Sequence, residues 1–331
     1  MNVVKLVSLC FGILIFGCDK DDERPRISIP DQISIEENGL YPEGVAFDAE
    51  ENVFYVSSIA KGKISKVTLE GNIETFADSP NLVTTLGMEI DKANNRLLVC
   101  VTDPGFNQAR SDSTTLAQLA AIAIYDLSSG NQTDFIQLTN GTPHLANDVV
   151  LDKAGNIYVS DSFSPSIHKI DTNGNVTALI TDAAFQPQPM NFGLNGLTYH
   201  NDDFLIVSKY DEGKLFKIPL SNPNNFSEIT ITNGNIPAID GILLTDNNTL
   251  AVSSNNLTGT APITEALYQL ITTDNWATAT IEKTVQAGTN SFPTTFTMVD
   301  DVLFVQYTRI QALVAGNNPA ATDFPIVRVN F

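Results

Sequence analysis

A single pattern recurs six times along this chain, and this repetition restricts the possible folds more than any other feature. Each copy opens with a short apolar segment that ends near an acidic or polar turn, and a segment rich in Val, Ile, Tyr and Ser follows it. The copies start 43 to 61 residues apart, at EGVAFD from Glu43, LGMEID from Leu86, NDVVLD from Asn147, NGLTYH from Asn195, DGILLT from Asp240 and TFTMVD from Thr295. A repeat of this length is typical of one structural unit that stacks against its neighbours.

Each repeat also contains further segments with the composition of β-strands. A second segment recurs as NVFYVSS, RLLVCVT, NIYVSDS, FLIVSKY, TLAVSSN and VLFVQYT, and a third as KISKVTL, AIAIYDL, SIHKID, KLFKIPL, ALYQLI and PIVRVNF. Turn residues such as Glu70-Gly71-Asn72 then lead into a fourth strand. Four strands in each of six repeats predict an all-β fold, a six-bladed β-propeller.

The last repeat lacks a fourth strand, because the chain ends on its third, at Phe331. The segment Ile27–Glu36, ISIPDQISIE, precedes the first repeat and alternates as a strand does. We expect this N-terminal segment to pair with the last blade, since pairing would close the ring and cover an open strand edge. The propeller is therefore predicted to span residues 27–331, with no second domain.

The first residues have the pattern of an export signal, with Lys5 followed by the uncharged stretch Leu6–Gly17. This stretch is too short to cross a bilayer as a helix. The segment before Cys18 resembles a bacterial lipobox, in which the signal is cut in front of a lipidated cysteine. We expect residues 1–17 to be a lipoprotein signal peptide, Cys18 to carry the lipid, and residues 18–26 to form an acidic linker.

This reading places the protein at the outer membrane, held there only through its lipid. The acidic run that begins at Asp19 fits a signal for transport to the cell surface, and it fits a solvated linker equally well. Both membrane faces therefore stay open, and we expect a monomer. The formal net charge is −20, from 38 acidic and 18 basic residues, which excludes nucleic acid as a partner.

Three cysteines give no disulfide framework, and Cys100 lies in an apolar strand where we expect it buried.

The repeat geometry brings six residues together. In a propeller the innermost strand of each blade lines the central channel, so the first residues of these strands form a ring at one mouth. The ring is predicted to consist of Glu43, Leu86, Asn147, Asn195, Asp240 and Thr295. Its carboxylates and amides suit a hard divalent cation, Ca²⁺ first, with Mg²⁺ or Mn²⁺ as alternatives, and nothing resembles a Cys/His zinc site. Turn formation also explains such residues singly, but four at one repeat position favour a metal.

The longest connections are predicted to gather at the same mouth. Asp103–Leu119, Asn256–Thr264 and Arg309–Asp323 join second to third strands, and Ala183–Gly193 leads into an inner strand. Long loops around a polar centre indicate a lidded pocket, although loops of variable length can also lack a function.

Four segments carry a family resemblance: YPEGVAFD, ANDVVLDKAGNIYVSD, LNGLTY and IDGILL. Together they resemble the SMP-30/gluconolactonase/luciferin-regenerating-enzyme family over nearly all of Ile27–Phe331. Members are six-bladed propellers, and the best known are metal-dependent lactone hydrolases. The resemblance implies that Glu43, Asn195 and Asp240 bind the metal and that Asn147 approaches the metal-bound water or the substrate. It also implies that Asp240 is the catalytic base.

One position departs from the family's sugar lactonases, which hold the substrate with an arginine two residues before the equivalent of Asn147. This chain has Leu145 there, so we expect a less polar lactone or ester as the substrate. His144 is either a second proton carrier or packed against a loop. His168, His200 and Trp276 are assigned no functional role.

Two other classes of function stay open. One is a non-catalytic surface propeller that binds a sugar, a peptide or a protein. The other is a strictosidine-synthase-like or lyase propeller. The complete ring of oxygen ligands favours the hydrolase, because a binding protein would be free to lose Glu43 or Asp240.

Overall fold

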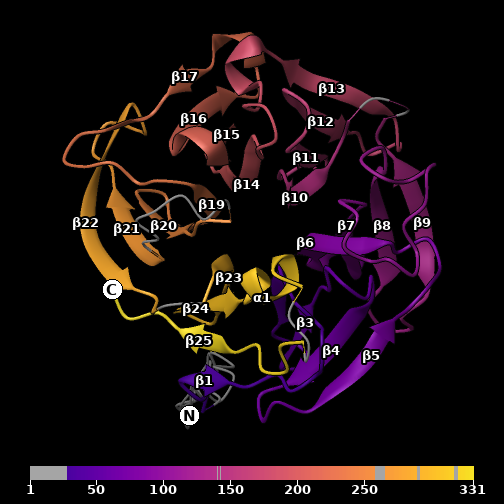
Figure 1. Ribbon diagram of the computed structural model, residues 1–331. Helices are drawn as coiled ribbons and strands as arrows, with labels where there is room; N and C mark the ends of the chain where they lie inside the picture. Colours follow the sequence, from indigo (N-terminus) through magenta and orange to yellow (C-terminus); the bar gives the residue numbers. More distant parts are fainter. Residues whose placement is uncertain (1–27, 140, 142, 258–264, 289–290, 317–319) are drawn as a thin grey trace, which may run out of the picture.

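The structure, a computed structural model, describes residues 28–331 apart from 140, 142, 258–264, 289–290 and 317–319. Six small sheets stand around one central axis like the blades of a propeller (Figure 1). Consecutive strands of a blade run from the axis outward and pair antiparallel. The all-β, six-bladed architecture predicted from the repeats is confirmed.

The first three blades each contain four consecutive strands. They comprise β2 (Val45–Asp48), β3 (Val53–Val56), β4 (Ile64–Thr68) and β5 (Ile73–Ala77); β6 (Thr84–Asp91), β7 (Arg96–Thr102), β8 (Ala120–Asp126) and β9 (Gln132–Gln137); and β10 (Ala146–Leu151), β11 (Ile157–Asp161), β12 (Ser166–Ile170) and β13 (Val176–Thr181).

Of the last three blades, the fourth follows this plan. The fifth adds a short strand, β18, which pairs parallel with β22 at its rim, and the sixth takes β1 as its outermost strand. These three blades comprise β14 (Leu194–His200), β15 (Phe204–Lys209), β16 (Lys214–Pro219) and β17 (Ser227–Glu228); β19 (Ile239–Asp246), β20 (Thr249–Ser254), β21 (Ala266–Ile271), β22 (Thr278–Gln286) and β18 (Thr230–Ile231); and β23 (Pro293–Val299), β24 (Val302–Tyr307), β25 (Ile326–Arg328) and β1 (Gln32–Ile33).

The ring closes as the sequence predicted. β1 pairs antiparallel with β25, with Ile33 opposite Ile326, and a further bridge joins Glu36 to Asp323. Ile33 and Ile35 are buried, so the closing segment contributes to the core as well as to the hydrogen bonding of the last blade. The N-terminal segment therefore supplies the fourth strand that the last repeat lacks.

The second strand of each blade is more buried than the outermost strand. Every residue of β3, β11 and β15 is buried, whereas β5 is partly and β9 largely exposed. The second strands are buried on both faces because neighbouring blades pack against them, which explains their nearly continuous apolar sequences. Cys100 is fully buried, as expected, and Trp276 packs in the core with its indole Nε1 donating to Asn247 O at 2.9 Å.

The helices of the described residues are short. One α-helix, α1 (Ile310–Val314), and four 3₁₀ turns lie in connections; the turns are η1 (Lys92–Asn94), η2 (Ala183–Phe185), η3 (Tyr210–Glu212) and η4 (Pro223–Asn225). Within the described part of the chain, no helix has the length and hydropathy needed to cross a membrane.

Candidate metal and substrate site

The inner strands approach one another most closely at their first residues. Glycine follows the ring position in four blades, as Gly44, Gly87, Gly196 and Gly241. A Cβ atom at any of these glycines would clash with the backbone carbonyl of the next blade's ring residue, for example Leu86 O beside Gly44. The Glu-Gly, Leu-Gly, Asn-Gly and Asp-Gly pairs of the repeats are therefore required by close backbone approach. This approach brings the side chains of the preceding residues together.

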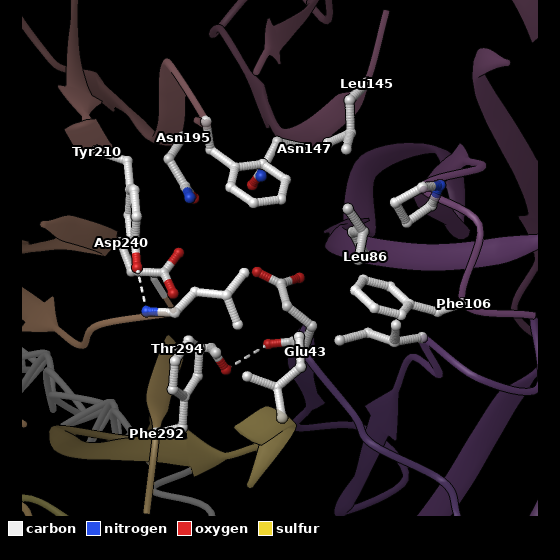
Figure 2. A pocket seen from close by; sticks show the side chains of 15 residues that line it. Glu43, Leu86, Phe106, Leu145, Asn147, Asn195, Tyr210, Asp240, Phe292 and Thr294 are labelled. Atoms are coloured by element: carbon white, nitrogen blue, oxygen red, sulfur yellow. Dashed lines mark hydrogen bonds between the residues drawn. The ribbon is translucent and has the colours of Figure 1, made fainter. Parts of the chain in front are cut away.

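A pocket lies over this meeting point (Figure 2). Its polar floor consists of Glu43, Asn147, Asn195, Asp240 and Thr294. The cavity measures about 60 Å³, room for a few water-sized groups. This space fits a hydrated cation together with one polar group of a ligand.

Five of the six predicted ring residues line this pocket, and the sixth prediction was wrong. Glu43, Leu86, Asn147, Asn195 and Asp240 are at the pocket, but Thr294 takes the position predicted for Thr295. Thr295 lines a second cavity, beside Met88 and Asp148. The pairing of β23 with β24 is irregular between Pro293 and Phe296, as it is around the ring residue in four other blades. This shared irregularity makes Thr294 the equivalent of Asp240, so the predicted start of the last repeat was one residue too late, and a shift of one residue turns a side chain to the other face.

Two polar atoms at the floor lack a partner. Glu43 Oε2 and Asn147 Oδ1 are buried, and neither has a hydrogen-bond partner among the described residues. Buried polar atoms are nearly always paired with protein, ordered water or an ion, so these two atoms are available to a ligand at the pocket floor. Both are oxygens, and both belong to residues predicted to hold a cation.

Asp240 is held firmly by its neighbours. Asn255 Nδ2 donates to Asp240 Oδ2 and also to Pro293 O at 2.7 Å. Tyr210 in turn donates its hydroxyl to Asn255 Oδ1 at 3.0 Å. Burial raises the pKa of Asp240 to about 6, and the amides of Asn255 and Asn195 act in the opposite direction. The carboxylate is therefore fixed in orientation and stays ionised near neutral pH.

Further acids crowd the axis around Asp240. Burial raises the pKa of Glu43 well above its usual value, and the charges of Asp240 and Asp148 add to the shift. The pKa of Asp148 rises to about 7 and that of Glu89 to about 8, in both cases first through burial. A cation between Glu43 and Asp240 would relieve their repulsion.

Hydroxyl groups of neighbouring blades fix the backbone of the ring. Ser160 Oγ donates to Asn195 O at 2.5 Å, Ser208 Oγ to Asp240 O at 2.9 Å and Ser253 Oγ to Thr294 O at 2.5 Å. Thr294 Oγ1 completes the series by donating to Glu43 O at 2.8 Å. The serine that recurs in the second strands was visible in the sequence, but we did not predict this role for it.

Three buried side chains form a network behind the pocket wall. Asp161 Oδ2 accepts from His144 Nδ1 at 2.6 Å and from His168 Nε2 at 3.2 Å, while Oδ1 accepts from Leu145 N at 2.9 Å. Burial opposes ionisation of Asp161, but the histidine hydrogen bonds lower its pKa below the usual value.

These three side chains are close enough together to be considered as metal ligands. The 2.6 Å separation of His144 Nδ1 and Asp161 Oδ2 is that of a hydrogen bond, shorter than the roughly 3.3 Å between two ligand atoms around one tetrahedral metal. The network instead anchors the backbone of Leu145 at the pocket. His144 is thus packed against Asp161, and His168, to which we assigned no role, belongs to the same network.

Comparison with known proteins adds a family and a fold. The family model described as SMP-30/Gluconolactonase/LRE-like region matches residues 41–260, about two thirds of the chain. No curated protein sequence matches this chain.

Several solved structures share the fold. The major allergen Mala s 1 of Malassezia sympodialis is 18% identical, with a TM-score of 0.68 over 92% of this chain and 97% of the allergen. Regucalcin of Agrobacterium tumefaciens, described as calcium-binding, is 15% identical, with a TM-score of 0.61 over 91% and 95%. A gluconolactonase of Xanthomonas campestris is 12% identical, with a TM-score of 0.60 over 90% and 89%. At these identities the likeness shows the fold alone.

Proposed function

The chain belongs to the SMP-30/gluconolactonase/LRE-like family, and on that premise we propose that it is a divalent-metal-dependent hydrolase that opens a lactone or an ester. One observation carries the proposal: two carboxylates and two amides converge on the pocket floor, where Glu43 Oε2 and Asn147 Oδ1 are buried without a partner. The gluconolactonase among the structural neighbours is consistent with this reaction.

The cation would be held by Glu43, Asn147, Asn195 and Asp240. These residues offer carboxylate and amide oxygens, the donors that hard divalent cations prefer, and Ca²⁺ is our first expectation ahead of Mg²⁺ and Mn²⁺. The charges of Glu43 and Asp240 would balance the charge of the ion. A neighbour of the same fold is described as a calcium-binding protein.

When bound, a divalent cation supplies polarisation of the substrate carbonyl and a lower pKa for water in the pocket. Asp240 is the proposed base, because its carboxylate faces the pocket (Figure 2) and a carboxylate there could accept the proton of the attacking water. Asn255 keeps that carboxylate in place by donating to Oδ2, which preserves its alignment during the proton transfer.

The proposal is tested by calorimetric titration of the purified protein with Ca²⁺ after chelation. We expect one site per chain, absent in Glu43→Ala and retained in Glu74→Ala, which changes an exposed glutamate on β5. Hydrolysis of a panel of lactones and esters should then depend on the same ion. Absence of binding with Ca²⁺, Mg²⁺ and Mn²⁺ would overturn the mechanism, and metal binding without turnover of any substrate would favour a non-catalytic binding propeller.

We also propose that the propeller is tethered to the outer membrane through a lipid on Cys18, which lies outside the described residues. The basis is the sequence pattern of residues 1–18. Labelled palmitate should be incorporated into the wild-type protein and not into Cys18→Ser, which should leave the membrane fraction. Equal labelling of both proteins would refute the anchor.

A further inference from the structure

The pocket is polar only at its floor. Apolar side chains form the wall around it, and they come from the connections of different blades; they include Phe106, Leu145, Phe192, Leu257, Phe292 and Ile310. Figure 2 shows Phe106 and Leu86 on one side of Glu43 and Phe292 on another. A ligand whose polar group reaches Glu43 and Asp240 must therefore place the rest of its atoms against hydrocarbon.

We propose that the substrate is a lactone or ester with an alkyl or aryl substituent, and not a polyhydroxylated sugar lactone. This inference rests on the proposed hydrolase function and names the substrate class of the same site. Sugar hydroxyls placed against Phe106 and Leu145 would lose water without gaining hydrogen-bond partners, whereas an alkyl chain gains free energy from leaving water.

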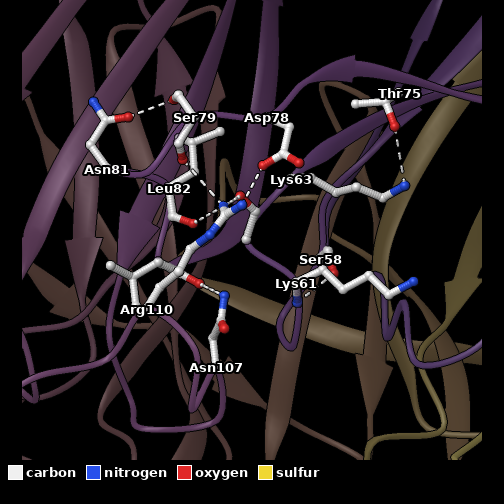
Figure 3. A network of polar contacts seen from close by, with 12 residues as sticks. Ser58, Lys61, Lys63, Thr75, Asp78, Ser79, Asn81, Leu82, Asn107 and Arg110 are labelled. Atoms are coloured by element: carbon white, nitrogen blue, oxygen red, sulfur yellow. Dashed lines mark hydrogen bonds and ion pairs between the residues drawn. The ribbon is translucent and has the colours of Figure 1, made fainter.

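The Phe106 side of the wall is preformed, because its loop is tied down. Arg110 lies in the same β7–β8 connection, and its Nη1 donates to the carbonyls of Gly62, Leu82 and Ser79 at 2.8, 2.9 and 3.2 Å (Figure 3). Its Nη2 forms an ion pair with Asp78. Asn107 Nδ2 donates to Val83 O at 2.6 Å. A fixed wall spares the entropy of ordering a loop on binding, so apolar contacts translate more fully into affinity.

The opposite side is held by aromatic packing. Phe192 stacks on Phe163 with ring centroids 5.5 Å apart and meets the edge of Tyr210 at 6.3 Å. Tyr210 is itself fixed by its hydrogen bonds to Asn255 and Leu257. Tyr210 thus contacts the wall residue Phe192 and also Asn255, the partner of Asp240.

The connections that form the wall also carry exposed apolar side chains. The large hydrophobic side chains that are most exposed among the described residues are Leu116, Met190 and Val314, at 47%, 102% and 50%. Each lies in the same connection as a wall residue, namely Phe106, Phe192 and Ile310.

The test uses two matched series of compounds, lactones and lactams, in which the ring oxygen of the lactone is replaced by NH. Alkyl γ-lactones with chains of zero to eight carbons are assayed for kcat/KM, and the corresponding γ-lactams, which resist hydrolysis, are titrated by calorimetry. We expect both to improve about fourfold per methylene over the first few carbons, the value for burying a CH₂ group. Glucono-δ-lactone should be turned over more slowly than the alkyl lactones.

Substitutions in the pocket wall show which residues cause the dependence on chain length. Phe106→Ala and Phe192→Ala should flatten the dependence on chain length in both series. Phe135→Ala, which removes the same ring from the outer strand β9, should leave it unchanged. Calcium affinity, measured in the same preparations, reports whether each variant keeps its floor intact.

The outcomes separate the two proposals. Hydrolysis that ignores chain length, or that prefers glucono-δ-lactone, would overturn the substrate class and leave the hydrolase standing. Lactam affinity that rises with chain length, without turnover of any lactone, would support the apolar ligand and overturn the hydrolysis. An unaltered chain-length dependence in Phe106→Ala and Phe192→Ala would overturn the assignment of the wall.

Discussion

The floor and the wall of the pocket are built from different parts of the same repeat. The floor comes from the first residues of inner strands, where Gly44 and Gly241 allow close approach and hydroxyls such as Ser208 fix the backbone. The wall comes from connections whose lengths differ from blade to blade, and it is held by contacts particular to each loop, such as those of Arg110. Repeated geometry therefore supplies oxygen ligands, while the insertions decide what surrounds them. Reaction type and substrate preference should accordingly respond to separate substitutions.

The largest loss of activity is expected from a substitution in the pocket floor. Asp240→Asn removes both the proposed base and a negative charge facing the cation, so kcat/KM should fall by about 10³-fold or more. Circular dichroism should show an unchanged fold, because the amide keeps the size of the carboxylate. Retention of full activity would exclude Asp240 as the base and leave the role to another group.

Metal removal should make stability depend on pH. In the metal-free protein the folded-state pKa values of Asp240 and Asp148 are raised to about 6 and 7. Because these carboxyls hold protons more tightly when folded, their contribution is fully favourable below about pH 4 and is lost as pH rises through 6 to 7. We expect a loss on the order of a few kcal/mol between pH 4.5 and 8, or roughly 5 °C or more in Tm.

Calcium should suppress this loss, and melting curves with and without the ion measure it. Asp148→Asn is the variant to compare, since it removes one of the raised groups and should reduce the slope. A Tm that stays constant over this range in chelator would contradict the crowding of acids at the axis.

A substitution in the pocket wall should alter substrate preference and leave metal binding unchanged. Leu145→Arg places a cation at a buried position of the pocket, where Leu145 is 1% exposed. We expect kcat/KM for an octyl lactone to fall about 10- to 100-fold relative to glucono-δ-lactone, since one contact in a pocket is worth about 1–3 kcal/mol. Calcium affinity measured beside it should change little. A proportional loss for both substrates would mean that the wall and the floor are not separable.

A substitution of Asn255, which holds Asp240 in place, should have a smaller effect on kcat/KM. Asn255→Ala removes a donor that lowers the pKa of Asp240, so the acidic limb of the kcat/KM profile should move upward by about one pH unit, a change of about 1.4 kcal/mol. Asn255→Asp replaces the donor with an acid and should not restore the wild-type profile. A lower kcat with an unmoved acidic limb would assign Asn255 to packing alone.

The last prediction tests the hydroxyl series through stability. Ser208→Ala leaves the buried carbonyl of Asp240 without that partner and should lower the free energy of unfolding by about 1–3 kcal/mol. Ser221→Ala, at an exposed serine, is the matched control. Denaturant titration measures both, and equal stability of the two variants would show that the hydroxyl does not support the floor.

Much of the fold and part of the site could be predicted from the sequence, because both are periodic. The six repeats predicted six blades, and the missing strand of the last one predicted its pairing with the N-terminal segment, now seen as β1 beside β25. Equivalent positions in a closed ring must meet at the axis, so Glu43, Asn147, Asn195 and Asp240 could be placed together before any coordinates.

Tertiary structure decided what periodicity does not encode. Single contacts made Asn255 the partner of Asp240, which no repeat position indicates. His168 joined His144 at Asp161 although it lies on a different strand of the blade. The long loops were predicted to gather at this mouth, but their sequences did not show that Phe106 and Phe192 would line the pocket. Repeats determine which backbones meet because strand pairing recurs, but the side chains that meet between them depend on packing in three dimensions.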